Sequence, residues 1–368
     1  MAKRSRNTVK RKRRRLIFGI ELVVLLVLVG VLFVYANITN KLGKIDISDS
    51  ADSADVKVNE QVVGSKVMKG YTNIALFGVD SRDENLDSSN SDTTIVASIN
   101  NDTKEVKLVS IYRDTYLNIG QDKDKYDKAN AAYAIGGPVQ AMSMLNTNMD
   151  LNIKNYVAVD FNALVKVIDL LGGLDVDLSY EEIEHMNNYC VETSKLTGKD
   201  YTPIEKPEPK PEDQEAIVGT YHLNGVQATS YCRIRYTAGN DFKRAARQRE
   251  VIQAIEDQAK KADYDTLSKV FNSAIDDVYT SLDSKDILDL LANITKYRIV
   301  DEGGFPEETM RATGNIGAKG SSVVPLDLES NVVWLHQFLF DDANYTVTDS
   351  VKEYSRKIAS DTAPYLNK

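Results

Sequence analysis

The spacing of apolar positions predicts a sheet in the first part of the chain. Residues 73–79 form a nearly continuous apolar run, which is typical of a strand buried on both faces. Residues 94–99 and 106–111 are two further strand-like runs, and the polar turn between them predicts a β-hairpin. The folded part is therefore expected to begin with strands.

Helical patterns then alternate with strands. Residues 131–149 contain a helix that is expected to start near Pro138, because proline is favoured in the first turn of a helix. An apolar helix predicted at 161–171 lies between short strands at 156–160 and 174–178. This alternation predicts an α/β fold, an α/β/α sandwich with a mixed central sheet.

The rest of the chain is expected to be mostly helical. Helices are predicted at 265–278, 284–294 and 329–340, with a last strand near 321–326. Residues 341–368 are polar and are expected to form a loose C-terminal tail.

One stretch interrupts the alternation. Residues 181–219 are charged and hold half of the eight prolines, so they are predicted to form an extended insertion loop on the surface. These prolines are Pro203, Pro207, Pro209 and Pro211.

The first 70 residues have a different pattern. Residues 1–15 carry nine Lys or Arg and no acidic residue, and residues 16–36 are apolar apart from Glu21. An apolar stretch of this length predicts one transmembrane helix, with the basic segment in the cytoplasm and the remainder outside. A cleaved signal peptide is the alternative, although the apolar run is long for one and no cleavage site follows it. Residues 37–70 are predicted to be an extracytoplasmic spacer before a folded domain at 71–340.

Charge and cysteine content restrict the function. Beyond residue 15, 36 of the 45 basic residues stand against all 54 acidic ones, so the main domain lacks the broad positive surface that nucleic acids require. The three histidines are scattered without cysteine neighbours, which argues against a zinc site. Cys190 and Cys232 could pair in an oxidising compartment. Because Cys232 is expected to point into the core, a free buried thiol is the other interpretation.

Half of the ten arginines beyond residue 36 are concentrated in one short segment. Residues 231–236 are predicted to be a strand, in which Arg233 and Arg235 share a face because side chains alternate. The five arginines are Arg233, Arg235, Arg244, Arg247 and Arg249.

A helix is predicted to follow this strand, with Asp241 in position to cap its N-terminus. Arg244 and Gln248 fall on the same helical stripe as Val251 and Ile255, so the stripe is expected to run from the core into a polar pocket. A helix N-terminus with converging guanidiniums suits an anion that carries phosphate. A solvated basic helix face is the alternative.

Charged side chains also stand at the ends of the predicted strands. Asp80 and Arg82 follow the first strand, Asp92 precedes the second, and Arg113 and Asp114 follow the third. Hard carboxylates beside a phosphate site are typical ligands of Mg²⁺, with Mn²⁺ as a second option, so Asp80 and Asp92 are candidate metal ligands. Both could equally be turn or cap residues, which aspartate favours.

The candidate chemistry is phosphoryl transfer. No nucleophile motif and no P-loop occurs, and the residues present suit a reaction that proceeds by positioning and charge neutralisation. Asp114 and Asp241 are candidate bases for an attacking hydroxyl, or they only orient arginines. The apolar helices at 138–145 and 161–171 either complete the core or line a slot for an acyl or prenyl chain.

About half of the chain, residues 73–255, carries short motifs in a fixed order. They are Gly78-x-Asp80-Ser81-Arg82, Ser91-Asp92-Thr93, Arg113-Asp114-Thr115, Lys128-x-Asn130, Gly136-Gly137-Pro138, Gly172-Gly173-Leu174, Arg233-x-Arg235 and Asp241-x-x-Arg244-x-x-Arg247-Gln248. This series resembles the motifs of the LytR-CpsA-Psr family. The basic N-terminus, the single span and the external domain are also similar to that family.

The resemblance implies an enzyme that moves a glycosyl-phosphate polymer, such as a teichoic acid or a capsule glycan, from a polyprenyl-pyrophosphate carrier to peptidoglycan. It also implies a place in the cell membrane of a Gram-positive-type envelope. Asp80 and Asp92 would hold Mg²⁺ on the pyrophosphate, with Lys128 and Gln248 nearby and Asp241 on the loop beside them. The arginines that would bind the pyrophosphate are Arg82, Arg113, Arg233, Arg235 and Arg244.

Two features depart from the family pattern. Ala131 stands where the family more often has histidine, and the proline-rich insertion before Tyr221 is long. Two other functions stay open: a pyrophosphatase that hydrolyses a lipid-linked diphosphate, and a surface binding or regulatory protein without catalysis.

Overall fold

The computed structural model describes residues 55–366, apart from 80–90, 121–124, 238–239 and scattered positions between 260 and 295. The strands are β1 (Tyr71–Val79), β2 (Ser91–Asn100), β3 (Glu105–Ile111), β4 (Tyr116–Asn118), β5 (Tyr126–Lys128), β6 (Asn155–Val159), β7 (Leu174–Ser179), β8 (Ile217–Leu223), β9 (Val278–Thr280), β10 (Arg298–Phe305), β11 (Arg311–Asn315) and β12 (Ser321–Pro325). The helices are α3 (Ala131–Met149), α4 (Phe161–Leu170), α5 (Tyr180–Thr197), α6 (Gly225–Tyr231), α7 (Asn240–Ala259), α10 (Leu328–Phe340) and α11 (Asp349–Leu366).

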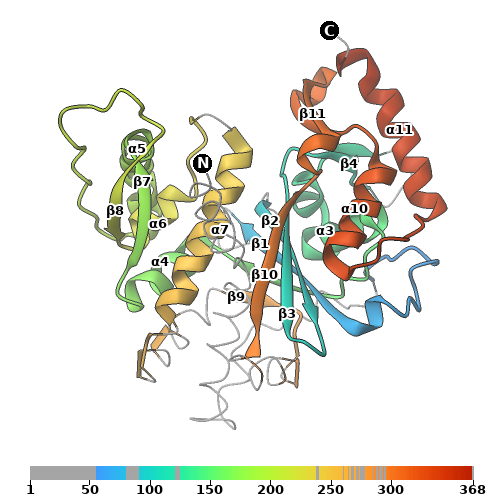
Figure 1. Ribbon diagram of the computed structural model, residues 1–368, viewed down its shortest axis with the longest axis horizontal. Helices are drawn as coiled ribbons and strands as arrows, with labels where there is room; N and C mark the ends of the chain where they lie inside the picture. Colours follow the sequence, from blue (N-terminus) through green and yellow to red (C-terminus); the bar gives the residue numbers. More distant parts are fainter. Residues whose placement is uncertain are drawn as a thin grey trace, which may run out of the picture.

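Six strands form one mixed sheet in the order β10-β3-β2-β1-β6-β9 (Figure 1). β1, β2 and β3 are antiparallel neighbours, whereas β6 lies parallel to β1 and β10 parallel to β3. β9 pairs antiparallel with β6. The predicted hairpin, the predicted strands in front of it and after it, and the mixed sheet are therefore confirmed.

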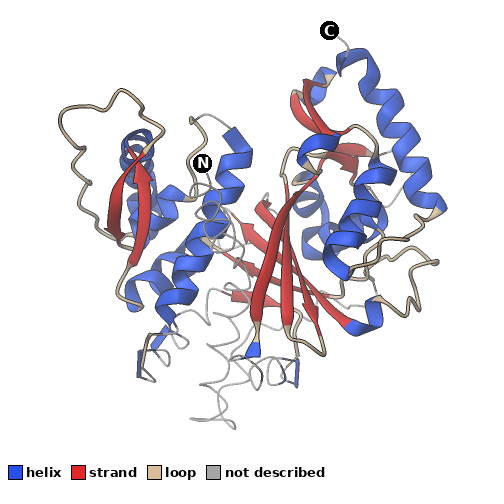
Figure 2. Cartoon of the chain, in the orientation of Figure 1, coloured by secondary structure: helices blue, strands red, loops and turns tan. Residues whose placement is uncertain are grey.

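Helices cover both faces of this sheet (Figure 2). Side chains of β1 alternate, so that Ala75 and Phe77 join a core with α3, α10 and α11, while Ile74 and Leu76 join a core with α4 and α7. A strand packed on both faces needs an almost continuous apolar sequence, which explains the run at 73–79. The prediction of a layered α/β architecture is confirmed.

A lateral lobe extends from one helix layer. It contains α4, α5, α6 and the two-stranded sheet of β7 and β8, and it has a hydrophobic core of its own (Figure 1). The strand predicted at 174–178 is therefore present as β7, but it pairs with β8 outside the central sheet. β12 likewise pairs only with β11 among the named strands of the described residues.

The prediction of a loop over 181–219 is wrong for its first half. α5 begins with a capping box, in which Ser179 accepts a hydrogen bond from the Glu182 backbone and Glu182 accepts one from the Ser179 backbone. The helix ends at Gly198, whose φ of 65° is a left-handed conformation that glycine adopts without strain. Only the proline-bearing residues between α5 and β8 are extended.

The prediction of a strand over 231–236 is also wrong. Tyr231 is the last residue of α6, which Asn224 and Gln227 start with a second capping box. The chain then turns through residues 232–237 without pairing to a strand. The alternation that was expected to place Arg233 and Arg235 on one face does not apply.

The predicted domain boundaries need correction at both ends. Within the predicted spacer 37–70, Val56 and Met68 are buried in the main core, so the folded part already includes residues before 71. The predicted loose tail contains α11, whose Val351 and Ile358 are fully buried in the same core. An amphipathic helix buries its apolar stripe even where the overall composition is polar.

Several predictions fall partly or wholly outside the described residues. These are the basic segment 1–15, the membrane span 16–36, and most of the helices at 265–278 and 284–294, although Val278 lies in β9. No helix in the described part of the chain is long and apolar enough to cross a membrane. β10 was not predicted at all, because its acids and glycines obscure its apolar positions.

Candidate functional site

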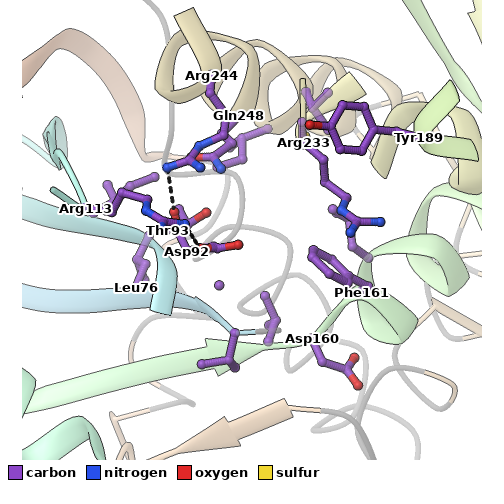
Figure 3. A pocket seen from close by; sticks show the side chains of 18 of the residues that line it. Leu76, Asp92, Thr93, Arg113, Asp160, Phe161, Tyr189, Arg233, Arg244 and Gln248 are labelled. Atoms are coloured by element: carbon purple, nitrogen blue, oxygen red, sulfur yellow. Dashed lines mark hydrogen bonds and ion pairs between the residues drawn. The ribbon is translucent and has the colours of Figure 1, made fainter. Parts of the chain in front are cut away.

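A cavity of about 410 Å³ lies between the central sheet and the helices α4, α5 and α7 (Figure 3). One part of its wall is apolar and consists of Leu76, Val79, Ile95, Val159, Phe161, Leu164, Val251 and Ile252. The other part is polar and includes Asp92, Thr93, Arg113, Asp160, Arg233, Arg235, Arg244 and Gln248. A cavity with this division suits a molecule that has an anionic end and an apolar end.

Asp92 stands at the centre of the polar part. Its carboxylate forms ion pairs with Arg113 and with Arg235, the latter at 3.3 Å, and Arg244 Nη2 lies 3.5 Å from its backbone oxygen. Figure 3 shows the side chains of Arg113 and Arg244 converging on Asp92. The antiparallel pairing of β2 with β3 explains why Asp92 and Arg113 meet, because Ile95 lies opposite Ser110. Asp92 lies three residues before Ile95, and Arg113 lies three residues after Ser110, so the same register brings them opposite each other.

Arg244 has donors without a protein partner. Its side chain is buried, Nη2 lies 3.0 Å from Asp241 Oδ1, and Nε and Nη1 find no hydrogen-bond acceptor among the described residues. Arg113 Nε also lacks a hydrogen-bond acceptor there. Burial lowers the pKa of Arg244 to about 10, so the guanidinium remains charged at neutral pH. Buried unsatisfied donors cost about 1–3 kcal/mol each, and an anion in the cavity would satisfy them.

Asp114 and Asp241 form a carboxyl pair beside the arginines. Burial and the neighbouring Asp114 raise the pKa of Asp241, although Arg244 opposes the shift. Burial would raise the pKa of Asp114 too, but its hydrogen bond with Asp241 and the charges of Arg113 and Lys128 hold it below the usual value. The two neighbouring carboxyls therefore have pKa values shifted in opposite directions, that of Asp241 upward and that of Asp114 downward. Lys128 Nζ lies 3.1 Å from Asp114 Oδ1 and does not line the cavity.

Arg233 lies across the cavity from this cluster (Figure 3). Its guanidinium donates to Thr193 Oγ1 at 2.9 Å and to Glu192 Oε2 at 2.8 Å, and it stacks on the Phe161 ring at 4.8 Å. Tyr189 lies beside it on α5. Arg233 thus belongs to the cavity wall, but its own ion pair is with α5 and not with Asp92.

The structure brings most of the predicted site residues together. Asp92, Arg113, Arg235, Arg244 and Gln248 line the cavity, and Asp114 and Asp241 lie next to it. Asp80 and Arg82 fall outside the described residues. Val79, the residue before Asp80, pairs with Ser91, the residue before Asp92.

Some contributors to the site were not predicted. Tyr189 lines the cavity and was missed because its helix was taken for a loop. Of the two helices considered for a lipid slot, α4 contributes Phe161 and Leu164, whereas α3 contributes no lining residue. Cys232 lines the cavity as a free, buried thiol, and Cys190 is also free and buried.

Arg247 was noted in the sequence as one of the concentrated arginines, but no contact or role was predicted for it. Its buried guanidinium donates to Glu182 Oε1 at 2.9 Å, to the Ile234 carbonyl at 3.2 Å and to Thr237 Oγ1 at 2.6 Å. These bonds fix the turn that carries Arg235. The sequence pointed to Arg247 through the concentration of arginines and the Asp241-x-x-Arg244-x-x-Arg247-Gln248 motif, but not to its supporting role.

The described residues contain no group of three or more His, Cys, Asp or Glu arranged to hold a metal ion. Two described carboxylates line the cavity, Asp92 and Asp160, and Asp92 is the one in the arginine cluster that it forms with Arg113, Arg235 and Arg244. Its carboxylate is a hard oxygen ligand of the type that Mg²⁺ accepts.

Comparisons with known proteins agree with this geometry. A protein called polyisoprenyl-teichoic acid–peptidoglycan teichoic acid transferase TagU, from Enterococcus faecalis, is 33% identical over 245 residues, which are 65% of this chain and 69% of that protein. A protein of the same name from Oceanobacillus iheyensis is 31% identical over 307 residues, which are 80% of this chain and 85% of that protein.

Solved structures share the fold. A structure described as TagT bound to LI-WTA has a TM-score of 0.56 at 23% identity, over 78% of this chain and 95% of that one. Another, described as a LytR-CPS2A-psr family protein with bound octaprenyl pyrophosphate lipid, has a TM-score of 0.51 at 22% identity, over 77% and 94% of the two chains. The model of the LytR_cpsA_psr family matches residues 32–328, and the chain belongs to that family.

Proposed function

We propose that this protein transfers a glycan with its phosphate from a polyprenyl diphosphate carrier to peptidoglycan. The observation that carries the proposal is the divided cavity, in which buried guanidinium donors of Arg113 and Arg244 without a hydrogen-bond acceptor among the described residues lie next to an apolar wall. A prenyl diphosphate has the matching two ends. The names of the relatives, which are teichoic acid transferases, support the glycan and the acceptor.

The reaction forms one bond and breaks one bond. An acceptor hydroxyl attacks the phosphorus that carries the sugar, the bond from that phosphorus to the bridging oxygen breaks, and prenyl phosphate leaves. The arginines on Asp92 neutralise the charge that develops on the phosphate oxygens. The Asp114 and Asp241 pair accepts the proton of the acceptor hydroxyl, because its carboxylates lie beside Arg113 and Arg244 next to the cavity.

We also propose that Mg²⁺, or Mn²⁺ in its place, is bound by Asp92 together with Asp80. Asp92 fits this role because its carboxylate is a hard ligand in the cavity wall, 28% exposed beside the arginines. A bound divalent ion would supply further positive charge to the diphosphate. The polymer that the relatives' names indicate is teichoic acid, while a capsule glycan would fit the same chemistry.

The membrane location is part of the proposal. It is supported by the apolar residues 16–36 and the basic residues 1–15, which predict a single span with the catalytic domain outside the cell. Such an anchor would keep the cavity close to the lipid carrier.

The function is tested with purified protein, Mg²⁺, a prenyl diphosphate that carries an oligosaccharide, and peptidoglycan fragments. Oligosaccharide linked to the fragments through phosphate is the expected product. Release of sugar phosphate in the presence of acceptor would instead indicate a pyrophosphatase. Binding of the donor without any turnover would contradict both enzymatic functions and indicate a surface binding protein.

A further inference from the structure

An exposed tyrosine stands beside the cavity. Tyr236 is 74% exposed, more than any other large hydrophobic side chain in the described part of the chain. Its backbone belongs to the turn between α6 and α7, which also carries Arg235. The exposed face of this ring, in a turn next to a cavity, is therefore accessible to a ligand.

Tyr236 extends a row of rings on α5. Its ring lies 6.4 Å from the Tyr189 ring at an interplanar angle of 20°, and 6.2 Å from the His185 ring at 37°. His185 and Tyr189 are one helical turn apart and therefore lie on the same side of α5. We name these three residues the aromatic platform.

The aromatic platform is continuous with the cavity. Tyr189 lines the cavity, and the Arg233 guanidinium lies 5.6 Å from the Tyr189 ring and 4.8 Å from the Phe161 ring (Figure 3). Tyr236 directly follows Arg235, which binds Asp92 in the arginine cluster. Through Tyr189 the platform thus reaches the same cavity that Arg235 and the other arginines of the cluster line.

Hydrogen bonds from the buried Arg247 side chain hold the turn that carries Tyr236 in place. Arg247 donates to the Ile234 carbonyl and to Thr237 Oγ1, which lie on either side of Arg235 and Tyr236. Its guanidinium is only 3% exposed and is paired with Glu182. The exposed ring is thus attached to a fixed backbone, so a ligand that covers it loses little conformational freedom of the protein.

The chemistry of the platform selects a sugar ring. The face of an aromatic ring is electronegative and attracts the C–H groups on the apolar face of a pyranose, whose hydroxyls remain at the edge. Glu181 Oε1 lies 3.9 Å from His185 Nε2 and so places a polar group beside the platform that can bind such hydroxyls. A second prenyl chain would not match this edge.

We propose that the aromatic platform binds the pyranose that is attached to the donor's diphosphate, by stacking of Tyr236 on the sugar face. This inference rests on the proposed function, because the sugar can reach the platform only when its phosphate lies in the arginine cluster. The platform then fixes the sugar relative to the phosphorus under attack and makes the protein discriminate between glycosylated and bare carriers.

The test compares two ligands by equilibrium binding to the full-length protein: a prenyl diphosphate, and the same prenyl diphosphate carrying one N-acetylhexosamine. We expect the unaltered protein to bind the glycosylated carrier more tightly. Tyr236→Ala should weaken binding of the glycosylated carrier about ten-fold, the upper range for one aromatic contact, and leave binding of the bare carrier unchanged. Tyr236→Phe should retain the affinity of the unaltered protein, since the ring face is kept. Tyr365→Ala, which removes an exposed tyrosine of α11, is the matched control and should change neither affinity.

The outcomes separate this inference from the proposed function. If the unaltered protein binds neither carrier, the proposed function is wrong. If it binds both and Tyr236→Ala binds both with unchanged affinity, the aromatic platform is not a sugar site. An equal loss for both carriers would also overturn the inference, because it would indicate displacement of Arg235. A change only in the KM for the peptidoglycan fragment would overturn the assignment of the platform to the donor.

Discussion

Arg247 offers the sharpest test of how the site is held together. It contacts neither the apolar wall nor Asp92 in the described structure, yet its three hydrogen bonds connect α5, the turn after α6 and α7. Arg247→Ala removes all of them and leaves the Glu182 carboxylate, whose side chain is 14% exposed, without its cation. The variant therefore tests whether the turn with Arg235 depends on a buried ion pair.

The expected loss can be worked out from the structure. Breaking a buried ion pair by removal of one partner costs about 3–5 kcal/mol, because the remaining charge is left in a poorly solvated place. We therefore expect Arg247→Ala to lower the free energy of unfolding by about 4 kcal/mol, within that range. Arg298→Ala is the matched control, since Arg298 pairs with Glu105 at 3.1 Å but is 65% exposed. An exposed pair contributes about 1 kcal/mol or less.

Urea unfolding followed by far-ultraviolet circular dichroism measures both variants against the unaltered protein. Binding of a prenyl diphosphate should also weaken in Arg247→Ala, because Arg235 is no longer held opposite Asp92. A stability loss no larger than that of Arg298→Ala would refute the reasoning. It would mean that the lateral lobe holds the turn without Arg247.

Three further predictions concern the charged groups. Arg113→Ala and Asp92→Ala should each abolish transfer while the circular dichroism spectrum stays unchanged. Normal turnover by either variant would contradict the mechanism in which the arginine cluster neutralises the phosphate charge. Arg233→Lys should lower the transfer rate about ten-fold, because one ammonium cannot replace two guanidinium donors with separate partners 2.8 and 2.9 Å away; rates equal to those of the unaltered protein would contradict this. Burial raises the pKa of Glu250 from 4.5 to about 7. Between these two pH values the folded state keeps a proton on Glu250 that the unfolded state loses. The contribution of Glu250 to the free energy of unfolding therefore declines as pH rises from about 4.5 to about 7. Glu250→Gln should remove that decline, and urea unfolding at several pH values would show parallel curves for the two proteins if the expectation is wrong.

The sequence was sufficient where the signal is local. The continuous apolar run of β1 and the two strands of the hairpin were predicted because burial on both faces permits few polar residues. Asp92 and Arg113 were identified as site residues because each is a charged residue where an apolar strand pattern begins or ends. Such a side chain has to lie at the end of the strand, outside the buried core. Their mutual contact follows from the hairpin register.

The sequence misled where composition outweighed pattern. The prolines after residue 202 suggested a loop over the whole stretch, and the capping box of Ser179 and Glu182 that starts α5 was overlooked. The Asn224 and Gln227 capping box of α6 was overlooked in the same way, so its last residue was taken for the start of a strand. Both errors concern helices that begin with a capping box and whose stability depends on packing in the lateral lobe.

The sequence by itself determined the family, the apolar strands and the set of charged residues available to a phosphate site. Tertiary structure alone decided which partner each of these charged residues contacts. Arg235 and Arg244 converge on Asp92, Arg233 turns toward Glu192, and Arg247 is buried as a support. The reason is physical: a guanidinium on a turn or helix can reach several acids, and only the packing of α5, α6 and α7 sets which carboxylate lies within about 3 Å.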